Sequence, residues 1–284
     1  MKKTHFARAL MALVCIALQP AFADAPTNTL ARIQTEKTIR IGLREKNPPF
    51  GYFEADKPAG LSWELCSAIV KQVEVTLKTK LKIIVTPVTL ASSFEGLKNG
   101  DIDLQCGSTT HTKEREEKVD FSYTFFVSGL TTAYRNDDIS FANPLQFGRV
   151  AALTGSTALK IIEARFARKG AANITAVVPV KSYEEALDKL KKKEVDTTFA
   201  DLVLMPIDPS ISVRRSLETI EPYALMMRKG DKQFSDMIDR SMIAVFATGA
   251  MKNFTKGSKF EGRINFLTLE SWRNPSKEAS LSLY

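Results

Sequence analysis

Histidine is almost absent from this chain of 284 residues, and cysteine is scarce. Only His5 and His111 occur, and the cysteines are Cys15, Cys66 and Cys106. So few histidines and cysteines argue against a zinc site, a Ser-His-Asp triad or a Cys-His pair, because each of these needs such residues. A Walker-type loop and the glycine pattern of dinucleotide-binding proteins are also missing. We therefore expect no metal, no cofactor and no catalytic centre, so the chain is not expected to be an enzyme.

Long apolar runs are missing beyond the first residues of the chain. No later stretch approaches the roughly 18 uninterrupted apolar residues of a membrane-spanning helix. The start differs, because Lys2, Lys3 and Arg8 precede an apolar stretch at residues 9–18 and a small-x-small sequence at 21–23. This is the layout of a secretory signal peptide. We expect cleavage after Ala23, with a retained N-terminal anchor as the alternative.

A strong excess of one charge sign is absent from the exported part. The formal charge of the whole chain is +8, and three of the positive residues lie in the expected signal peptide. Acidic and basic residues alternate along most of the sequence, and the run Lys191-Lys192-Lys193 lies on a predicted helix with an apolar opposite face. A solvated helix face explains this run, so no nucleic-acid partner is expected.

Cleavage would remove Cys15 and leave Cys66 and Cys106. In an oxidising compartment, these two cysteines either pair or remain as two buried thiols. The sequence leaves both alternatives open.

Hydrophobic periodicity predicts alternating strands and helices. The first unit has strands at residues 39–44, 81–88 and 102–106, with helices at 61–78 and from Ser92 or Ser93 to Asn99. The second unit has strands at 150–153, 174–180 and 196–200, with helices at 158–168 and 183–192. A strand after Tyr223 and helices near 234–246 and 251 follow. The order predicts two α/β lobes, each with a parallel sheet covered by helices.

Polar residues follow the strands, where ligands bind in open α/β sheets. They are Arg44, the loop 106–110 with Arg115 soon after it, the segment 154–157 at a helix N-terminus, and Asp201. A guanidinium and a helix N-terminus suit a carboxylate, and an aspartate suits an ammonium group. Each of these residues alone is more often a surface ion pair or a turn, but their combination predicts an amino-acid receptor.

Several short motifs occur in a defined order along the chain. They are residues 47–52 (NPPFGY), 60–65 (GLSWEL), 99–104 (NGDIDL), Thr110 with Glu114-Arg115, and 119–122 (VDFS). With these motifs, nearly all of the mature chain resembles the polar-amino-acid-binding proteins of ABC importers, solute-binding protein family 3. Arg44-Glu45, residues 106–110 and residues 221–234 (EPYALMMRKGDKQF) are most similar to the glutamate/aspartate-binding branch.

The resemblance implies an α/β fold of the two-lobed, type II periplasmic-binding-protein class. Each lobe would be a mixed, mainly parallel sheet flanked by helices, with hinge crossings near residues 129–134 and 223–228. Lobe 1 would comprise residues 24–130 and 224–284, and lobe 2 residues 131–223. The resemblance further implies a periplasmic monomer that binds a small amino acid and delivers it to an inner-membrane ABC permease.

The resemblance also implies roles for individual residues. Arg115 would clamp the α-carboxylate, helped by the backbone N–H groups of Thr110 and Ser156. Asp201 would hold the α-ammonium group together with Ser108 and the Thr110 hydroxyl. These groups form the part of the receptor that any α-amino acid would use.

The side-chain pocket resembles the glutamate/aspartate branch less closely. Arg44 lies where the family reads the ligand side chain, and an arginine there suits an acidic one. Leu90 stands where that branch has a hydroxyl, Ser93 where it has a second arginine, and Tyr183 where it has a histidine. The ligand is therefore either an acidic amino acid held by Arg44 alone or a smaller, less charged one.

Two other functions remain as alternatives. Some periplasmic dehydratases resemble this family, and an acid near the cleft, such as Glu45, would then protonate a leaving group. An amino-acid sensor that acts through another protein is the third hypothesis.

Overall fold

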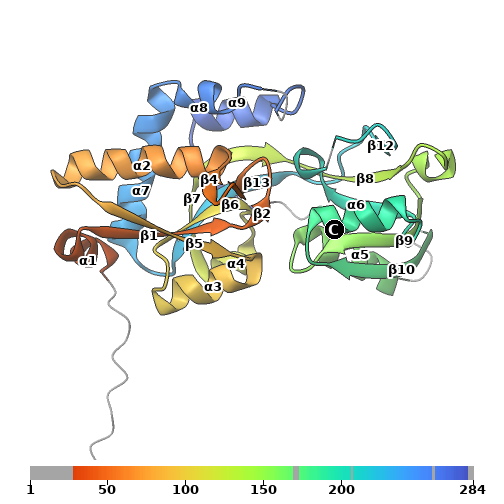
Figure 1. Ribbon diagram of the computed structural model, residues 1–284, viewed down its shortest axis with the longest axis horizontal. Helices are drawn as coiled ribbons and strands as arrows, with labels where there is room; N and C mark the ends of the chain where they lie inside the picture. Colours follow the sequence, from red (N-terminus) through yellow and green to blue (C-terminus); the bar gives the residue numbers. More distant parts are fainter. Residues whose placement is uncertain (1–27, 169–172, 206, 258–259, 281–284) are drawn as a thin grey trace, which may run out of the picture.

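The described part of the chain forms two lobes that lie side by side along the long axis of the molecule (Figure 1). A computed structural model describes residues 28–168, 173–205, 207–257 and 260–280. Each lobe is built on a five-stranded sheet, so the expected two-lobed α/β architecture is confirmed. The expected signal peptide, residues 1–23, lies outside the described residues.

Lobe 1 contains the sheet β5-β1-β6-β13-β7. Its strands are β1 (Thr38–Arg44), β5 (Lys82–Val88), β6 (Leu104–Thr110), β7 (Val119–Ser128) and β13 (Glu221–Arg228). The helices of this lobe are α1 (Thr29–Glu36), α2 (Leu61–Leu77), α3 (Leu90–Asn99), α4 (Lys113–Glu116), α7 (Lys232–Ala247), α8 (Ala250–Phe254) and α9 (Phe266–Arg273). A small antiparallel sheet, β2 (Lys46–Asn47), β3 (Gly51–Glu54) and β4 (Lys57–Ala59), follows β1.

Lobe 2 repeats the same plan with the sheet β10-β9-β11-β8-β12. Its strands are β8 (Leu130–Arg135), β9 (Gln146–Leu153), β10 (Asn173–Val180), β11 (Thr197–Asp201) and β12 (Ile211–Val213). Its helices are α5 (Thr157–Ala167) and α6 (Tyr183–Lys191), with short 3₁₀ turns η1 (Ile139–Ala142) and η2 (Leu202–Leu204).

Both sheets are mixed for the same reason. The strands of each β-α-β-α-β unit pair in parallel, as in β5-β1-β6 and β10-β9-β11. A strand that continues from the other lobe then pairs antiparallel with each unit, β13 in lobe 1 and β8 in lobe 2. The carboxyl ends of the parallel strands in each lobe therefore lie beside the segments that join the lobes.

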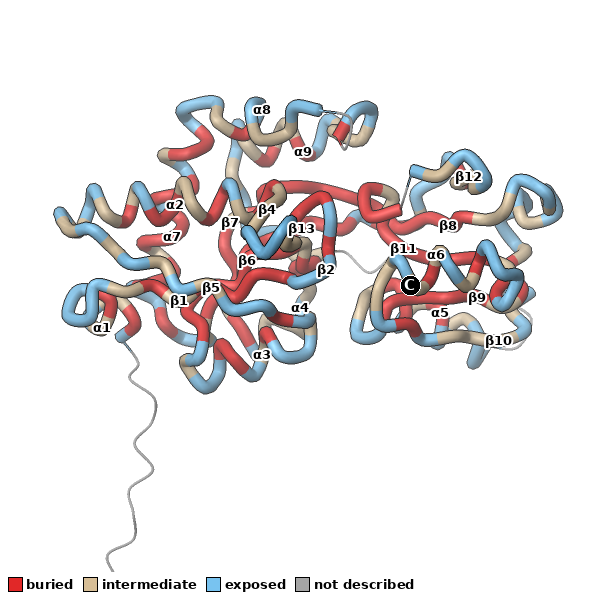
Figure 2. The backbone as a smooth tube through the Cα atoms, in the orientation of Figure 1, coloured by how far each residue is buried: buried red, intermediate tan, exposed pale blue. Residues whose placement is uncertain are grey.

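Side chains on the two faces of each sheet belong to different apolar cores. In β9, Val150 and Ala152 pack beneath α5, whereas Ala151 packs on the side of α6. In β13, Met226 faces one core of lobe 1 and Met227 faces the other. Figure 2 shows that the buried residues follow the strands and continue through the segment between the lobes. The period-two alternation of the sequence accounts for this two-sided burial.

Two local expectations from the sequence are wrong. Residues 106–110 were expected to form a loop, but β6 continues to Thr110 because β13 pairs with it. The helix that runs to Asn99 was expected to be capped by Ser92 or Ser93, but Thr89 is the N-cap residue of this helix, α3, and exchanges hydrogen bonds with Ser92 in a capping box.

The two crossings between the lobes lie side by side. β7 ends at Ser128, which pairs with Glu221, the first residue of β13. Beyond this pair, the Leu130 N–H donates to Thr219 Oγ1 at 3.1 Å, and its carbonyl accepts from Glu218 N at 2.8 Å. The second crossing therefore lies just before Glu221 and not at residues 223–228, which are paired within the lobe 1 sheet.

Cys66 in α2 and Cys106 in β6 form a disulfide, with their Cα atoms 6.5 Å apart. Of the two alternatives that the sequence left open, the paired one is present. The bond ties the helix that follows the small sheet to the strand that ends at Thr110. Within the described residues, none of the helices is long and apolar enough to cross a membrane.

Candidate functional site

Polar side chains from both lobes meet beside the crossings. Lobe 1 contributes Arg44 at the end of β1 and Arg115 in α4. Lobe 2 contributes Asp201 at the end of β11 and the first residues of α5 and α6. The charges of Arg115 and Asp201 interact across this region. The structure therefore brings together the arginine and the aspartate that the sequence singled out.

Arg115 bridges the two lobes. Its Nη1 donates to the Thr110 carbonyl at 2.7 Å and its Nη2 donates to the Gly155 carbonyl at 3.1 Å. Burial lowers the pKa of its guanidinium, while the nearby carboxylates Glu221 and Asp201 oppose this effect. An arginine has five N–H donors, so these two bonds leave three for a further acceptor.

Arg44 is a buried cation without a carboxylate partner. The residue is 8% exposed, and its side chain forms no hydrogen bond or salt bridge with any other described residue. Burial lowers the pKa of its guanidinium, and the phenols of Tyr183 and Tyr223 oppose this effect. The side chain passes over Gly107, where a Cβ atom would lie 2.4 Å from Arg44 Cγ. A buried charge is costly unless it is paired, so an anion beside Arg44 would be stabilising.

Asp201 is the most perturbed acid of the site. Its residue is 5% exposed, and Oδ1 has no hydrogen-bond partner among the described residues. Burial and the negative charge of Glu221 raise the pKa of its carboxyl to about 7. The Tyr223 hydroxyl and Arg115 favour the charged form, although the Tyr223 hydroxyl forms no hydrogen bond itself. A positive group placed here would stabilise the carboxylate.

Ser108 and Thr110 lie on β6, at the edge of lobe 1 that faces the site. The Ser108 hydroxyl donates to Asn47 Oδ1 at 2.8 Å, which leaves its lone pairs free to accept. Thr110 is buried, and its carbonyl accepts from Arg115. The sequence singled out Asn47 only as the first residue of the motif at 47–52, but its side-chain amide accepts from Ser108 and orients it.

Ser156 does not offer the donor that was expected of it. It is the N-cap residue of α5, where its hydroxyl accepts from Leu159 N at 3.0 Å. Its own N–H donates to the Leu153 carbonyl at 3.0 Å, because the turn before the helix closes on itself. This N–H is therefore already occupied. Leu90, at the start of α3, lies near Gly155 of lobe 2, within 3.6 Å of where a Cβ would stand.

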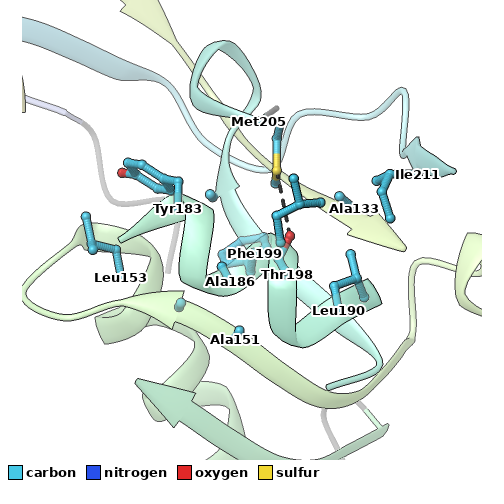
Figure 3. Close-up of a pocket in the computed structure, with 13 residues that line it drawn as sticks. Ala133, Ala151, Leu153, Tyr183, Ala186, Leu190, Thr198, Phe199, Met205 and Ile211 are labelled. Atoms are coloured by element: carbon cyan, nitrogen blue, oxygen red, sulfur yellow. Dashed lines mark hydrogen bonds between the residues drawn. The ribbon is translucent and has the colours of Figure 1, made fainter. Parts of the chain in front are cut away.

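Tyr183 is the first residue of α6 and packs against two apolar clusters. One is the largest cluster, which combines residues of lobe 1 with Val203 and Leu204 of lobe 2, and the other is the small core formed by Ala133, Ala200 and Met205. Figure 3 shows its ring at one end of a narrow apolar cavity beneath α6, with Leu190 farther along that helix. The cavity volume is about 10 Å³, close to that of a single water position. It is a packing space and not a ligand site.

Two buried residues of β13 complete the site and were not identified from the sequence. Glu221 is 1% exposed, and its Oε2 accepts from the Thr157 hydroxyl at 2.9 Å. The Tyr223 hydroxyl is buried, and burial raises the pKa of this phenol well above its usual range. One signal in the sequence could have revealed them. The chain returns to lobe 1 at β13, so the first polar residues of this strand lie beside the crossing between the lobes.

The architecture and this site have a counterpart among known proteins. The sequence pattern of the bacterial extracellular solute-binding proteins, family 3, matches residues 39–257. The chain belongs to this family. The matched residues include most of both lobes and all of the site residues described above.

Two relatives are identical to this chain at between a quarter and a third of the aligned positions. The L-glutamate/L-aspartate-binding protein of Pseudomonas aeruginosa is 29% identical over 242 residues, 81% of this chain and 79% of that protein. The glutamate/aspartate import solute-binding protein of Escherichia coli is 28% identical over 249 residues, 84% of this chain and 82% of that protein.

A solved structure confirms the fold of the family in this chain. It is an ancestral amino acid-binding protein described as a precursor of cyclohexadienyl dehydratase, with a TM-score of 0.70 and 21% sequence identity. The similarity covers 84% of this chain and 100% of the other. At this identity, the likeness concerns the fold alone.

Proposed function

We propose that the protein captures an amino acid between its lobes and delivers it to an ABC importer. The observation that supports the proposal is that Arg115 of lobe 1 reaches the Gly155 carbonyl of lobe 2, the lobe that contributes Asp201, whose buried Oδ1 has no partner among the described residues. The free donors of Arg115 suit an α-carboxylate, and Asp201 suits an α-ammonium group. The hydroxyls of Ser108 and Thr110 would accept from the same ammonium group.

The preferred ligand in this proposal has an acidic side chain. Arg44 is buried and has no carboxylate partner among the described residues, so a ligand carboxylate would remove the cost of its burial. The relatives of Pseudomonas aeruginosa and Escherichia coli are named for glutamate and aspartate, which agrees with this assignment. Tyr183 and Leu90 would bound the space beside Arg44.

The direct test is a ligand panel measured by calorimetry on protein that has been unfolded and refolded to remove bound ligand. Glutamate or aspartate should bind, with glutamine and asparagine weaker. Replacing one partner of a desolvated charged pair costs about 2–5 kcal/mol, so Arg115→Ala and Asp201→Ala should each lose binding about 30-fold or more. Wild-type affinity in either folded variant would overturn the assignment of that residue.

Arg44→Ala separates the side-chain assignment from the common amino-acid anchor. The substitution removes the cation that faces the ligand side chain, so acidic ligands should lose more affinity than their amides. Calorimetry with aspartate, asparagine, glutamate and glutamine measures this difference. Equal losses for all four ligands would contradict the selector role of Arg44, and binding of neutral ligands alone by the wild type would reassign the ligand class.

The proposed place of action is the periplasm. The family is described as extracellular, and disulfides such as Cys66–Cys106 persist in oxidising compartments. The basic and apolar start of the sequence supports export with cleavage after Ala23. There the protein would act as a monomer, and the closed arrangement would be recognised by an inner-membrane permease.

An enzyme on this scaffold is the alternative. Glu45, the acid considered for it, directly follows β1 and is exposed. Incubation with prephenate-like acids distinguishes the two functions, because turnover would favour a dehydratase and a stoichiometric thermal shift without turnover would favour binding. A role in sensing would require the same ligand but another partner protein.

A further inference from the structure

Glu221 is a fully buried carboxylate at the point where the chain re-enters lobe 1. It is the first residue of β13, it pairs with Ser128 of β7, and it is 1% exposed. Its Oε2 accepts a hydrogen bond from Thr157 Oγ1 at 2.9 Å. Glu221 belongs to the lobe 1 sheet and Thr157 belongs to lobe 2. This bond therefore joins the two lobes.

The partner of Glu221 lies at a favourable place for a negative charge. Thr157 is the first residue of α5, a helix of 11 residues. The N-terminus of a helix carries a partial positive charge, which stabilises a nearby carboxylate. The Ser156 hydroxyl already accepts from the N–H of Leu159. At the start of this helix, the Thr157 hydroxyl is the group that donates to Glu221.

Two further contacts between the lobes involve the same short segment of lobe 2. Arg115 donates to the carbonyl of Gly155, and Lys160 forms a salt bridge with Glu114. The salt bridge is exposed on both sides, so its contribution is small. The bond between Glu221 and Thr157 is the contact of this group that joins a buried carboxylate to the other lobe.

We propose that Glu221 is a positioning residue that holds the lobes closed through Thr157. Opening the cleft breaks this bond and moves the carboxylate away from the start of α5. A ligand that requires the closed arrangement therefore binds more tightly when the bond is present, because less of its binding energy is needed for closure. The inference takes its ligand from the proposed function, but the effect of the Glu221–Thr157 bond on closure does not depend on that function.

Thr157→Val tests the bond with a side chain of the same shape. A hydrogen bond to a charged group is typically strong, so the variant should bind glutamate or aspartate about 10- to 100-fold more weakly, mainly through faster dissociation. Thr157→Ser is the matched control, because it keeps the hydroxyl and should bind within a few-fold of the wild type. Stopped-flow fluorescence gives the dissociation rate and calorimetry gives the affinity.

A double-variant cycle distinguishes closure through the bond between Glu221 and Thr157 from a general structural role of the two residues. Glu221→Gln removes the charge, and the variant with both Glu221→Gln and Thr157→Val should lose no more affinity than the weaker-binding single variant. Additive losses, or wild-type dissociation from Thr157→Val, would overturn the proposal. Equal loss of affinity in Thr157→Ser and Thr157→Val would also overturn it.

Closure measured without ligand keeps this test separate from the proposed function. Spin labels at the exposed positions Lys71 of lobe 1 and Lys192 of lobe 2 report the distance between the lobes. Thr157→Val should shift the distance distribution toward longer values in the ligand-free protein, and Thr157→Ser should not. If no amino acid binds but this shift occurs, the role of the Glu221–Thr157 bond in closure is supported and the proposed function fails. An unchanged distribution would overturn the proposed role of this bond in closure.

Discussion

At the scale of single residues, Asp201 is a carboxylate that the protein buries without supplying all of its partners. Oδ1 has no hydrogen-bond partner among the described residues, and the negative Glu221 lies nearby. Burial and this neighbour raise its pKa to about 7, against a usual value near 3.9. The ligand-free site therefore holds a proton over much of the acidic range, and a bound ammonium group would displace it.

The ligand affinity of the wild type should consequently depend on pH. Binding requires the charged form of Asp201, so below about pH 7 a proton must leave, and affinity should fall about tenfold for each pH unit. Above pH 7 the affinity should level off. Calorimetry between pH 5.5 and 8.5 in buffers of different ionisation enthalpy measures both the affinity and the proton released. An affinity that is constant over this range would contradict the assignment of Asp201.

The same pKa has the opposite consequence for the empty protein. Folded Asp201 holds its proton more tightly than the unfolded chain does, so its contribution to the free energy of unfolding is complete below about pH 4. This contribution is lost as pH rises through about 7. Asp201→Asn should flatten this part of the pH dependence, which urea denaturation at several pH values would reveal.

At the scale of elements, the disulfide joins α2 to the strand that carries Ser108 and Thr110. Its cysteines are 40 residues apart in the sequence. β6 is also paired with β1 on one side and with β13 on the other. The two pairings hold the strand in place independently, so the disulfide is expected to affect stability more than the geometry of the site.

Replacing Cys66 and Cys106 together by alanine should therefore lower the free energy of unfolding by about 2–4 kcal/mol, because the unfolded chain regains the freedom of the closed loop. Ligand affinity should change little. Urea denaturation and calorimetry on the same sample measure the two quantities. As a control, a reductant should destabilise the wild type by a similar amount and leave the variant unchanged. A loss of affinity as large as the loss of stability would show that the disulfide positions Ser108.

At the scale of the whole molecule, the two crossings are packed so closely that Gly129 has no room for a side chain. A Cβ atom there would lie 2.6 Å from the carbonyl oxygen of Thr219 and 3.0 Å from Leu217. The crossings are also joined by hydrogen bonds between Leu130 and the segment 218–219. Their relative position sets how the lobes face each other.

Gly129→Ala should separate the crossings. Overpacking of this kind costs about 1–3 kcal/mol of stability. Ligand affinity should also fall, because separating the crossings changes how the two lobes face each other across the site. Gly96→Ala is the matched control, because in α3 the added Cβ meets side-chain atoms and no backbone, the nearest being Ile102 Cγ1 at 3.3 Å, and the substitution gains helix propensity. Denaturation and calorimetry of both variants test the prediction, which fails if Gly129→Ala is as stable as the control.

Local patterns were sufficient for most elements. The alternation in β1 and the helical spacing in α2 reflect side-chain periodicity along a single segment, and both elements appear close to the expected bounds. Arg44 and Asp201 were found because parallel strands direct their carboxyl ends to one edge of a sheet. The occupied N–H of Ser156 was missed because its acceptor depends on how the turn before α5 closes.

The sequence alone determined the family, the alternation of strands and helices, and the arginine and aspartate at the strand ends, since each depends on neighbouring residues. Only the tertiary structure decided that β6 extends to Thr110, that Cys66 reaches Cys106, and that Glu221 meets Thr157. These features join segments that lie far apart in the sequence: 40 residues for the disulfide, 64 for Glu221 and Thr157, and more than 100 for the pairing of β6 with β13. Contacts of this kind arise from the packing of complete lobes, and no local pattern encodes them.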